Sequence, residues 1–208
     1  MNELSEPVWL WQTPTMALIL GYVLGSIPFG IILTRLGGAG DLRAIGSGNI
    51  GATNVLRTGR KGLAIATLLL DLAKGAGAVL IGEALVPGGG LIGGAAAFIG
   101  HCYPLWLRFK GGKGVATMMG VVTAVHPLSG LVFALVWIGA LAGTRWSSVG
   151  GMSAAVSAPI AAIVFDQIEI VPLFLALAMI VLWRHRDNIV RLFKGEEPKI
   201  SSSKPAQA

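Results

Sequence analysis

The sequence predicts an all-α membrane protein, a polytopic bundle of about seven transmembrane helices. Three observations predict this class. Hydrophobic residues make up 54% of the 208-residue chain and charged residues only 12%, with a mean hydropathy of +0.74. Apolar runs alternate with short polar loops, and the basic residues gather in some of these loops only. Because no soluble globular domain needs so much apolar sequence, residues 1–194 are expected to form one integral-membrane domain.

The distribution of positive charge predicts the orientation. Fifteen of the sixteen Lys and Arg lie in four segments, and the exception, Lys74, lies within an apolar run. These segments are residues 35–61, 108–113, 145 and 184–204. The first fourteen residues carry Glu3 and Glu6 but no basic residue, so they indicate an uncleaved first span rather than a signal peptide. This positive-inside pattern predicts an outside N-terminus and a cytoplasmic C-terminus, and it argues against nucleic acid as a partner.

The first two spans contain residues that are unusual in a membrane. The first is expected from about Thr15 to Arg35, where Pro28 should kink the helix near its inner third. The second, about 62–84, carries Asp71 and Lys74 three residues apart on one helical face. Ionisable groups are costly in hydrocarbon and usually pair inside the bundle. We interpret the two as a structural ion pair, with contact to a substrate as the alternative.

Five further apolar runs are expected to complete the bundle. They span about residues 91–107, 114–126, 128–143, 149–165 and 170–183. The runs at 114–126 and 128–143 are shorter than the roughly twenty residues that a full span needs. Either both are short crossing helices, or the segment 114–143 is re-entrant and the chain crosses five times. The Ser-, Lys- and Pro-containing tail, residues 195–208, is predicted to be a disordered cytoplasmic segment.

The loop after the first span carries the motif Gly46-Ser47-Gly48-Asn49-Ile50-Gly51-Ala52-Thr53-Asn54, with Arg57 shortly after it. Its glycines let backbone N–H groups turn toward one point, while the Ser, Asn and Thr side chains add donors and Arg57 adds positive charge. The glycine spacing also fits a dinucleotide-binding fingerprint, but that fingerprint requires a preceding strand, and an apolar helix precedes this loop. We therefore interpret it as a phosphate cradle, with a plain polar loop as the alternative.

A second glycine-rich motif, Gly111-Gly112-Lys113-Gly114-Val115-Ala116-Thr117, opens the fourth run. Bare N–H groups, the positive end of a helix dipole and the Lys113 ammonium come together there. The motif is shorter than a P-loop, yet it predicts a second anion site.

Four polar clusters are expected to meet at the inner face. They are residues 43–57, 110–117, 145–148 and 184–188. Together they hold anion-binding groups and one candidate general base, His185, but neither an adjacent acidic pair nor a Cys/His metal set. The residues thus indicate group transfer on an anionic substrate, with no metal.

Several motifs, in this order, resemble the acyl-phosphate-dependent glycerol-3-phosphate acyltransferases of bacterial phospholipid synthesis. The resemblance covers almost the whole chain. It is carried by Gly25–Gly30, Gly46–Asn54, Leu70-Asp71 with Lys74-Gly75, Gly100-His101 with Tyr103-Pro104, Gly111–Thr117 and Arg184-His185-Arg186 with Asn188.

The resemblance implies a seven-helix protein of the bacterial inner membrane with its active site on the cytoplasmic face. Such an enzyme transfers a fatty acyl group from acyl phosphate to the sn-1 hydroxyl of glycerol 3-phosphate, giving 1-acylglycerol 3-phosphate (lysophosphatidic acid) and inorganic phosphate. It uses no cofactor. A soluble enzyme that produces acyl phosphate is expected as a partner.

The resemblance also implies the site residues. Matched residue by residue, the catalytic set is Ser47, Ser148, His185 and Asn188. The substrate-binding set is Ser47, Asn49, Asn54, Arg57, Lys113 and Thr117. Arg57 and Lys113 are expected to hold the two phosphates, and Asn188 to donate to the developing oxyanion. Two questions stay open: whether Ser147 or Ser148 is the site serine, and whether His185 or the departing phosphate takes the hydroxyl proton.

Two alternative functions remain. An acyl-thioester-dependent acyltransferase would be expected to pair a His with an Asp five positions later, which none of His101, His126 and His185 has. A membrane transporter or channel for a phosphorylated solute would suit a broken first span and an intramembrane Asp71 and Lys74. The sequence shows no inverted repeat, however, and its polar clusters gather on one face. Acyl-chain preference and oligomeric state are left open.

Overall fold

Helices make up almost all the regular structure of residues 13–200, which are the residues that the computed structural model describes. The predicted all-α membrane fold is confirmed. The α-helices are α1 (Pro14–Gly25), α2 (Phe29–Leu36), α3 (Ala52–Leu56), α4 (Lys61–Leu85), α5 (Gly89–Cys102), α6 (Val115–Val125), α7 (Pro127–Thr144), α8 (Ser147–Val164), α9 (Val171–Arg184) and α10 (Arg186–Phe193). Residues 1–12, at the start of the predicted domain 1–194, lie outside the described range.

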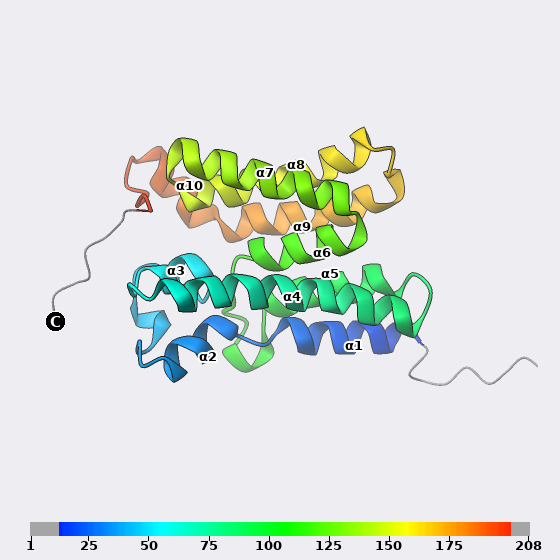
Figure 1. Ribbon diagram of the computed structural model, residues 1–208, viewed down its shortest axis with the longest axis horizontal. Helices are drawn as coiled ribbons and strands as arrows, with labels where there is room; N and C mark the ends of the chain where they lie inside the picture. Colours follow the sequence, from blue (N-terminus) through cyan, green and yellow to red (C-terminus); the bar gives the residue numbers. More distant parts are fainter. Residues whose placement is uncertain (1–12, 201–208) are drawn as a thin grey trace, which may run out of the picture.

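The long helices lie side by side in two groups (Figure 1). One group holds α1, α4 and α5, the other holds α7, α8 and α9, and the short α6 lies between them. The α4–α5, α6–α7 and α8–α9 turns lie at one end of the bundle. At the other end lie α2, α3 and α10, and we call this the site end. Because the sequence places its polar motifs next to these elements, the fold gathers them at a single end.

Span lengths match the sequence prediction closely. Within residues 13–200, five helical segments are long and apolar enough to cross a membrane, and residues 168–184 with α10, beyond a bend of 56°, count as a sixth only if the pair is taken as one span. The five are residues 14–36, 61–85, 89–107, 127–144 and 147–164. Of the two short runs in 114–143, α7 reaches 18 residues, whereas α6 has only 11 and begins near the middle of the bundle (Figure 1). Of the seven apolar segments predicted from the sequence, the one at α6 is therefore too short to cross a membrane as a straight helix.

The kink predicted at Pro28 is a complete break. Helix α1 ends at Gly25 and α2 begins at Phe29. The carbonyl oxygens that the break frees are satisfied by distant side chains: Trp106 Nε1 donates to Ser26 O at 3.0 Å and Lys74 Nζ to Ile27 O at 2.8 Å. Such partners are what allows a broken helix at membrane depth.

The core lies where the two groups of helices meet through α6. Phe98, Met118, Phe133 and Phe174 are buried there, against the small side chains of α8. Alanines and glycines let the helix backbones approach closely, as in other membrane bundles. The large apolar side chains that remain exposed on α1, α4, α7 and α9 form a surface suited to lipid.

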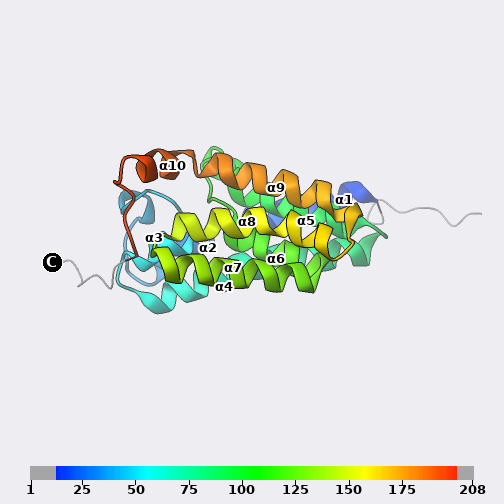
Figure 2. The same ribbon diagram turned by 90° about the horizontal axis from the view of Figure 1, so that it is seen from above.

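Residues 195–200 are the described part of the tail that the sequence predicts to be disordered. After α10 the chain turns back across the site end to the start of α8 (Figure 2). Ile200 N donates to Arg145 O at 2.8 Å, and Trp146 Nε1 donates to Glu197 O at 3.0 Å. These contacts fix a segment that lacks helical periodicity, which is why the sequence alone suggested disorder. Residues 201–208 lie outside the described range.

Candidate active site

A cavity of about 260 Å³ lies at the site end and collects the predicted residues. Its walls come from α3 and the residues on either side of it, from α4, α5, α6, α7 and α8, from the loop before α6, and from α10 with the residues on either side of it. Eight of the nine predicted site residues line it. They are Ser47, Asn49, Asn54, Arg57, Lys113, Ser148, His185 and Asn188. The structure therefore brings together residues that lie up to 141 positions apart in the chain.

Thr117 is the exception. It is fully buried in α6, packs against Gly75 of α4, and does not line the cavity. The first residues of α6 turn toward the cavity at Val115 and Ala116, and helical rotation carries Thr117 to another face. Its predicted substrate contact is not supported by this geometry.

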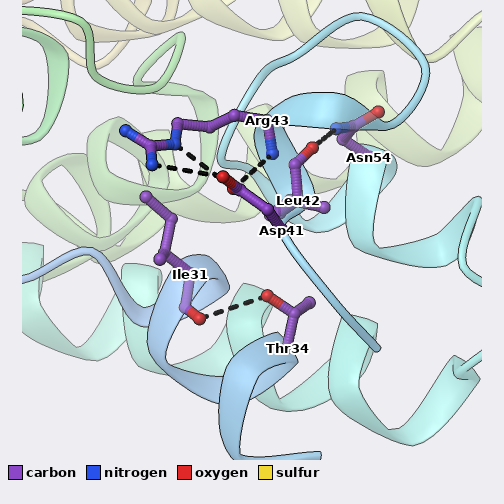
Figure 3. A network of polar contacts seen from close by, with 6 residues as sticks. All are labelled: Ile31, Thr34, Asp41, Leu42, Arg43 and Asn54. Atoms are coloured by element: carbon purple, nitrogen blue, oxygen red, sulfur yellow. Dashed lines mark hydrogen bonds and ion pairs between the residues drawn. The ribbon is translucent and has the colours of Figure 1, made fainter. Parts of the chain in front are cut away.

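Asn54 holds the first anion loop, residues 46–54, in shape. Its Nδ2 lies 2.9 Å from Leu42 O, 2.9 Å from Ile45 O and 2.8 Å from Asn49 O, and Figure 3 shows the contact with Leu42. At Gly46, which has φ of 54°, a Cβ would lie 2.6 Å from Asn54 Oδ1. Because these bonds occupy the Asn54 amide, the side chain shapes the loop, and its predicted contact with substrate stays a prediction.

Arg43, close to this loop in sequence, lies outside the cavity. Its guanidinium pairs with Asp41 at 3.2 Å (Figure 3). That side-chain hydrogen bond, more than any other cause, lowers the pKa of Asp41. The pair is exposed, so it contributes little to stability.

Arg57 and Ser47 remain free to bind an anion. Within residues 13–200 the Arg57 guanidinium makes no hydrogen bond or ion pair, and the Ser47 hydroxyl makes no hydrogen bond. Arg57 lies across the first loop, because a Cβ on Gly46 would come within 2.8 Å of its Nη1. A guanidinium and a hydroxyl beside turned N–H groups form a suitable phosphate site.

The second anion loop, residues 111–114, is held from two sides. Gly112 N donates to His101 O at 3.0 Å, while Arg184 donates to Gly111 O at 2.8 Å and to Gly112 O at 3.1 Å. A Cβ on Gly112 would lie 2.0 Å from His101 Nε2, so the contact requires glycine. The loop therefore has a fixed backbone and presents a single cation, Lys113, to the cavity.

Lys113 reaches from this loop to α10, where its Nζ donates to Asn188 Oδ1. Burial lowers the pKa of Lys113 to about 8, although the negative charge of Glu197 acts in the opposite direction. At pH 7 the ammonium is therefore charged, and it loses its proton as the pH rises through 8. Anion binding that depends on Lys113 should weaken over the same range.

Sulfate keeps its double charge over this range and is a suitable probe. We expect the Kd for sulfate of the purified protein to rise by up to tenfold per pH unit above pH 8, because each unit reduces the charged fraction by that factor. Lys113→Arg, which stays charged, should flatten the profile. Titrations followed by calorimetry between pH 6 and pH 10 would measure both. The same alkaline weakening in Lys113→Arg would exclude Lys113 as its source.

His185 lies just past the end of the α9 span and is buried at the cavity wall. Its Nδ1 is 2.8 Å from Val181 O, which assigns the proton to Nδ1 and leaves Nε2 as an acceptor. Burial, and next the charge of Lys113, lower the pKa of His185 to about 4. The ring is therefore neutral at pH 7 and can accept a hydrogen bond from a substrate hydroxyl.

Glu197 is the site residue that sequence reasoning missed. Its carboxylate accepts hydrogen bonds from Ser148 Oγ at 2.7 Å, Asn188 Nδ2 at 2.6 Å and Arg191 Nε at 2.8 Å. Burial raises its pKa, but these bonds outweigh burial and hold the pKa below its ordinary value. The only signal in the sequence was the acidic pair Glu196-Glu197 in a mainly basic segment.

Both candidate serines line the cavity. Ser148 is buried and bonded to Glu197, whereas Ser147 is half-buried and its hydroxyl makes no hydrogen bond among the described residues. Through Glu197, Ser148 is linked to Asn188. This geometry associates Ser148 with the catalytic set and leaves the Ser147 hydroxyl as a further donor in the cavity.

An apolar groove continues from the cavity along the bundle. Leu68, Leu69 and Leu72 of α4 form one wall, Met119 of α6 lies between the walls, and α7 contributes the other wall. The α7 residues are Phe133, Ala134, Trp137 and Ile138. Leu69 and Ile138 are more than half exposed, so the groove opens to the surface that would face lipid.

Comparison with known proteins gives consistent matches. A family model described as glycerol-3-phosphate acyltransferase matches residues 15–195. The glycerol-3-phosphate acyltransferase of Erythrobacter litoralis is 54% identical over 191 residues, covering 91% of this chain and 96% of the relative. That of Caulobacter vibrioides is 50% identical over 211 residues, covering 100% and 96%.

Solved structures agree with this. A crystal structure of PlsY, an integral membrane glycerol 3-phosphate acyltransferase in its glycerol 3-phosphate form, superposes with a TM-score of 0.84 at 36% identity. It covers 91% of this chain and 96% of the other. The lysophosphatidic acid form of PlsY gives 0.82 at 34% identity, with the same coverage.

Proposed function

The chain belongs to the glycerol-3-phosphate acyltransferase family, and from this premise we propose that it acylates the sn-1 hydroxyl of glycerol 3-phosphate with acyl phosphate as donor. The products are 1-acylglycerol 3-phosphate and inorganic phosphate. One observation carries the choice of donor: a single cavity joins two anion-binding loops to an apolar groove. Two phosphate sites suit a reaction in which donor and acceptor each carry a phosphate, and the groove suits a fatty acyl chain.

Each part of the cavity then has a role. Arg57 and Ser47 bind one phosphate and Lys113 the other, Arg57 through its planar fork and Lys113 as a point charge beside the start of α6. The acyl chain lies in the groove between α4 and α7, where it remains in contact with lipid. Asn49 lines the same wall as Ser47 and supplies an amide donor.

The reaction needs no external reagent. The sn-1 oxygen attacks the acyl carbon, the new C–O ester bond forms, and the bond from the acyl carbon to the phosphate oxygen breaks. The hydroxyl proton leaves with the phosphate. The departing phosphate gains one negative charge as this bond breaks, which makes it a stronger base than an imidazole with a pKa of about 4, and it leaves as the hydrogen phosphate dianion. We therefore assign final proton acceptance to the leaving phosphate, and orientation of the hydroxyl to His185 Nε2.

Asn188 and Ser148 are placed to organise the cationic side of the site. Asn188 accepts from Lys113 and donates to Glu197, and Ser148 donates to the same carboxylate. In this arrangement Asn188 aims Lys113 at the cavity. Its predicted donation to an oxyanion requires the amide to turn away from Glu197 when substrate binds.

The donor is tested directly by a comparison of acyl groups on different carriers. Purified enzyme in detergent should convert glycerol 3-phosphate with palmitoyl phosphate and give no product above background with palmitoyl-CoA or palmitoyl-acyl-carrier protein, because only the first donor places a bare phosphate beside the acyl carbon. Product is measured as radiolabelled 1-acylglycerol 3-phosphate. Turnover with the thioesters alone would favour the thioester-dependent alternative. Absence of turnover with all three, together with solute uptake into liposomes, would favour the transporter.

We further propose that the site end faces the cytoplasm and that the protein resides in the bacterial inner membrane. Support comes from the clustering of Lys and Arg in loops at this end. A soluble enzyme that makes acyl phosphate would then release it on the side from which the cavity opens.

Cysteine labelling in whole cells tests this orientation. Pro87→Cys and Gln167→Cys, exposed at the end opposite the site, should react with an impermeant maleimide, whereas Arg60→Cys and Lys194→Cys at the site end should react only after lysis. Cys102 is fully buried and serves as the internal blank. The reverse labelling pattern would show the opposite orientation.

A further inference from the structure

Three buried ionisable side chains have no assigned part in the reaction, although two of them, Asp71 and His101, line the cavity. Asp71 and Lys74 on α4 are each 3% exposed and His101 on α5 is 4% exposed. Lys74 Nζ lies 2.7 Å from Asp71 Oδ1, and His101 Nδ1 lies 3.6 Å from the same oxygen. The predicted Asp71–Lys74 ion pair is thus present, and a histidine from the neighbouring helix joins it. Such groups are costly in a membrane protein, so their presence calls for a specific role.

The Lys74 end of this group contacts the support of the first anion loop. Lys74 Nζ donates to Ile27 O at 2.8 Å, in the break before α2, and lies 5.6 Å from the centre of the Phe29 ring. Helix α2 then packs on the loop itself: a Cβ on Gly30 would lie 2.0 Å from Ile50 O. A shift of α4 would therefore move the break and α2, and with them the loop that precedes Arg57.

The His101 end contacts the second anion loop. The His101 ring lies directly against Gly112, and its backbone carbonyl accepts from Gly112 N at 3.0 Å. Lys113 is the next residue, and Arg184 holds the loop from the other side. The distance of 3.6 Å between Asp71 Oδ1 and His101 Nδ1 is too long for a hydrogen bond, so close packing, including the contact with Gly112, keeps the ring in place.

We propose that Lys74, Asp71 and His101 form one positioning unit, which sets the separation between the Arg57 and Lys113 phosphate sites. The inference rests on the proposed function, because it assumes that each site holds one phosphate of the reacting pair. A misplacement of 1 Å between reacting groups can reduce the rate by about 10²-fold. The group thus links the two halves of the site through the interior of the bundle.

A plain structural ion pair is the competing explanation, and a paired substitution separates the two. Asp71→Asn alone would leave a buried ammonium without its partner and could prevent folding. Asp71→Leu combined with Lys74→Met removes both charges, and such replacements of buried pairs are often neutral or stabilising. We expect this paired variant to remain folded in detergent with a somewhat lower thermal midpoint, because the Ile27 carbonyl oxygen loses its Lys74 donor. It should raise KM for glycerol 3-phosphate at least tenfold and lower kcat. Unchanged kcat and KM would overturn the proposal.

A distance measurement decides the matter independently of turnover. Nitroxide labels at Ala44→Cys and Lys110→Cys, both exposed and each beside one of the anion loops, report the separation of these loops, and the buried Cys102 should not label. Double electron–electron resonance between the two nitroxides should give a narrow distance distribution in the parent and a shifted or broadened one in the paired variant. The same narrow distribution in both would overturn the positioning unit even if activity were lost.

Glu83→Gln is the matched control. Glu83 is a second acidic residue of α4, but it lies at the end opposite the site and accepts from Gly88 N and Gly90 N. Its kinetics and label distance should match the parent. If the parent itself shows no turnover of glycerol 3-phosphate, the proposed function fails, while the label distance still decides whether the three residues position the loops.

Discussion

Lys113→Ala and Arg57→Ala are expected to abolish most of the activity. A cation that holds a phosphate contributes in the ground state and in the transition state alike, and removal of one partner of such a desolvated pair costs about 2–5 kcal/mol of transition-state binding. Lys113 is half-buried and should fall near the upper end of this range, whereas Arg57 is exposed in the substrate-free protein and should fall near the lower end. Measurement of kcat/KM for both substrates would quantify each loss.

Arg43→Ala is a suitable control for this experiment. Arg43 belongs to the same basic loop but pairs with Asp41 outside the cavity, so its removal should change kcat/KM by less than about twofold. Near-parental activity in both Arg57→Ala and Lys113→Ala would remove these residues from the site. A loss equally large in Arg43→Ala would show that the loop responds to total charge rather than to specific contacts.

His185→Ala is expected to lose on the order of 10²–10³-fold in kcat, because the substrate hydroxyl loses the acceptor that orients it. His185→Asn should recover at least part of this loss, since its amide oxygen can accept the same hydrogen bond. With a pKa of about 4 the ring is already neutral above pH 5, so a profile between pH 5 and pH 8 should contain no limb from His185. Parent and His185→Asn should therefore give profiles of the same shape.

Two results would contradict this assignment. His185→Asn as inactive as His185→Ala, together with an acid limb present only in the parent, would make the imidazole the proton acceptor. Glycerol 3-phosphate affinity should remain near the parental value in both variants, and this can be measured with acyl phosphate omitted. A large loss of that affinity would instead place His185 in phosphate binding.

The sequence predicted the bundle because its signals were local. Span limits follow from apolar runs, and the break near Pro28 follows from the missing N–H of proline, so both agree with the structure. The two anion loops were found because glycine, hydroxyl and basic residues stand next to one another in the chain. Eight predicted residues then meet in one cavity, since the loops that carry them lie at the same end of the bundle.

The features of the site that could not be predicted from the sequence depend on contacts between distant segments. Glu197 lies in a run without helical periodicity, and only the return of residues 195–200 to Trp146 brings its carboxylate into the site. Asn54 ends a polar motif, but the sequence could not show that its amide also holds the loop backbone. Thr117 shares a motif with Lys113 but follows the helical turn away from the cavity.

Because α6 is short, the cavity in which the two substrates would meet can lie below the surface of the membrane. With 11 residues α6 is about 16 Å long, whereas the hydrocarbon layer of a bilayer is about 30 Å thick. The second anion loop and the cavity therefore occupy the place that a helix of full span length would fill. A water-soluble phosphate ester must sink below the headgroup level to react, whereas the acyl donor can reach the site by lateral diffusion without leaving the leaflet. The rate of the reaction should therefore depend on bilayer thickness, because a thicker membrane lengthens the path of the water-soluble substrate and not that of the acyl donor.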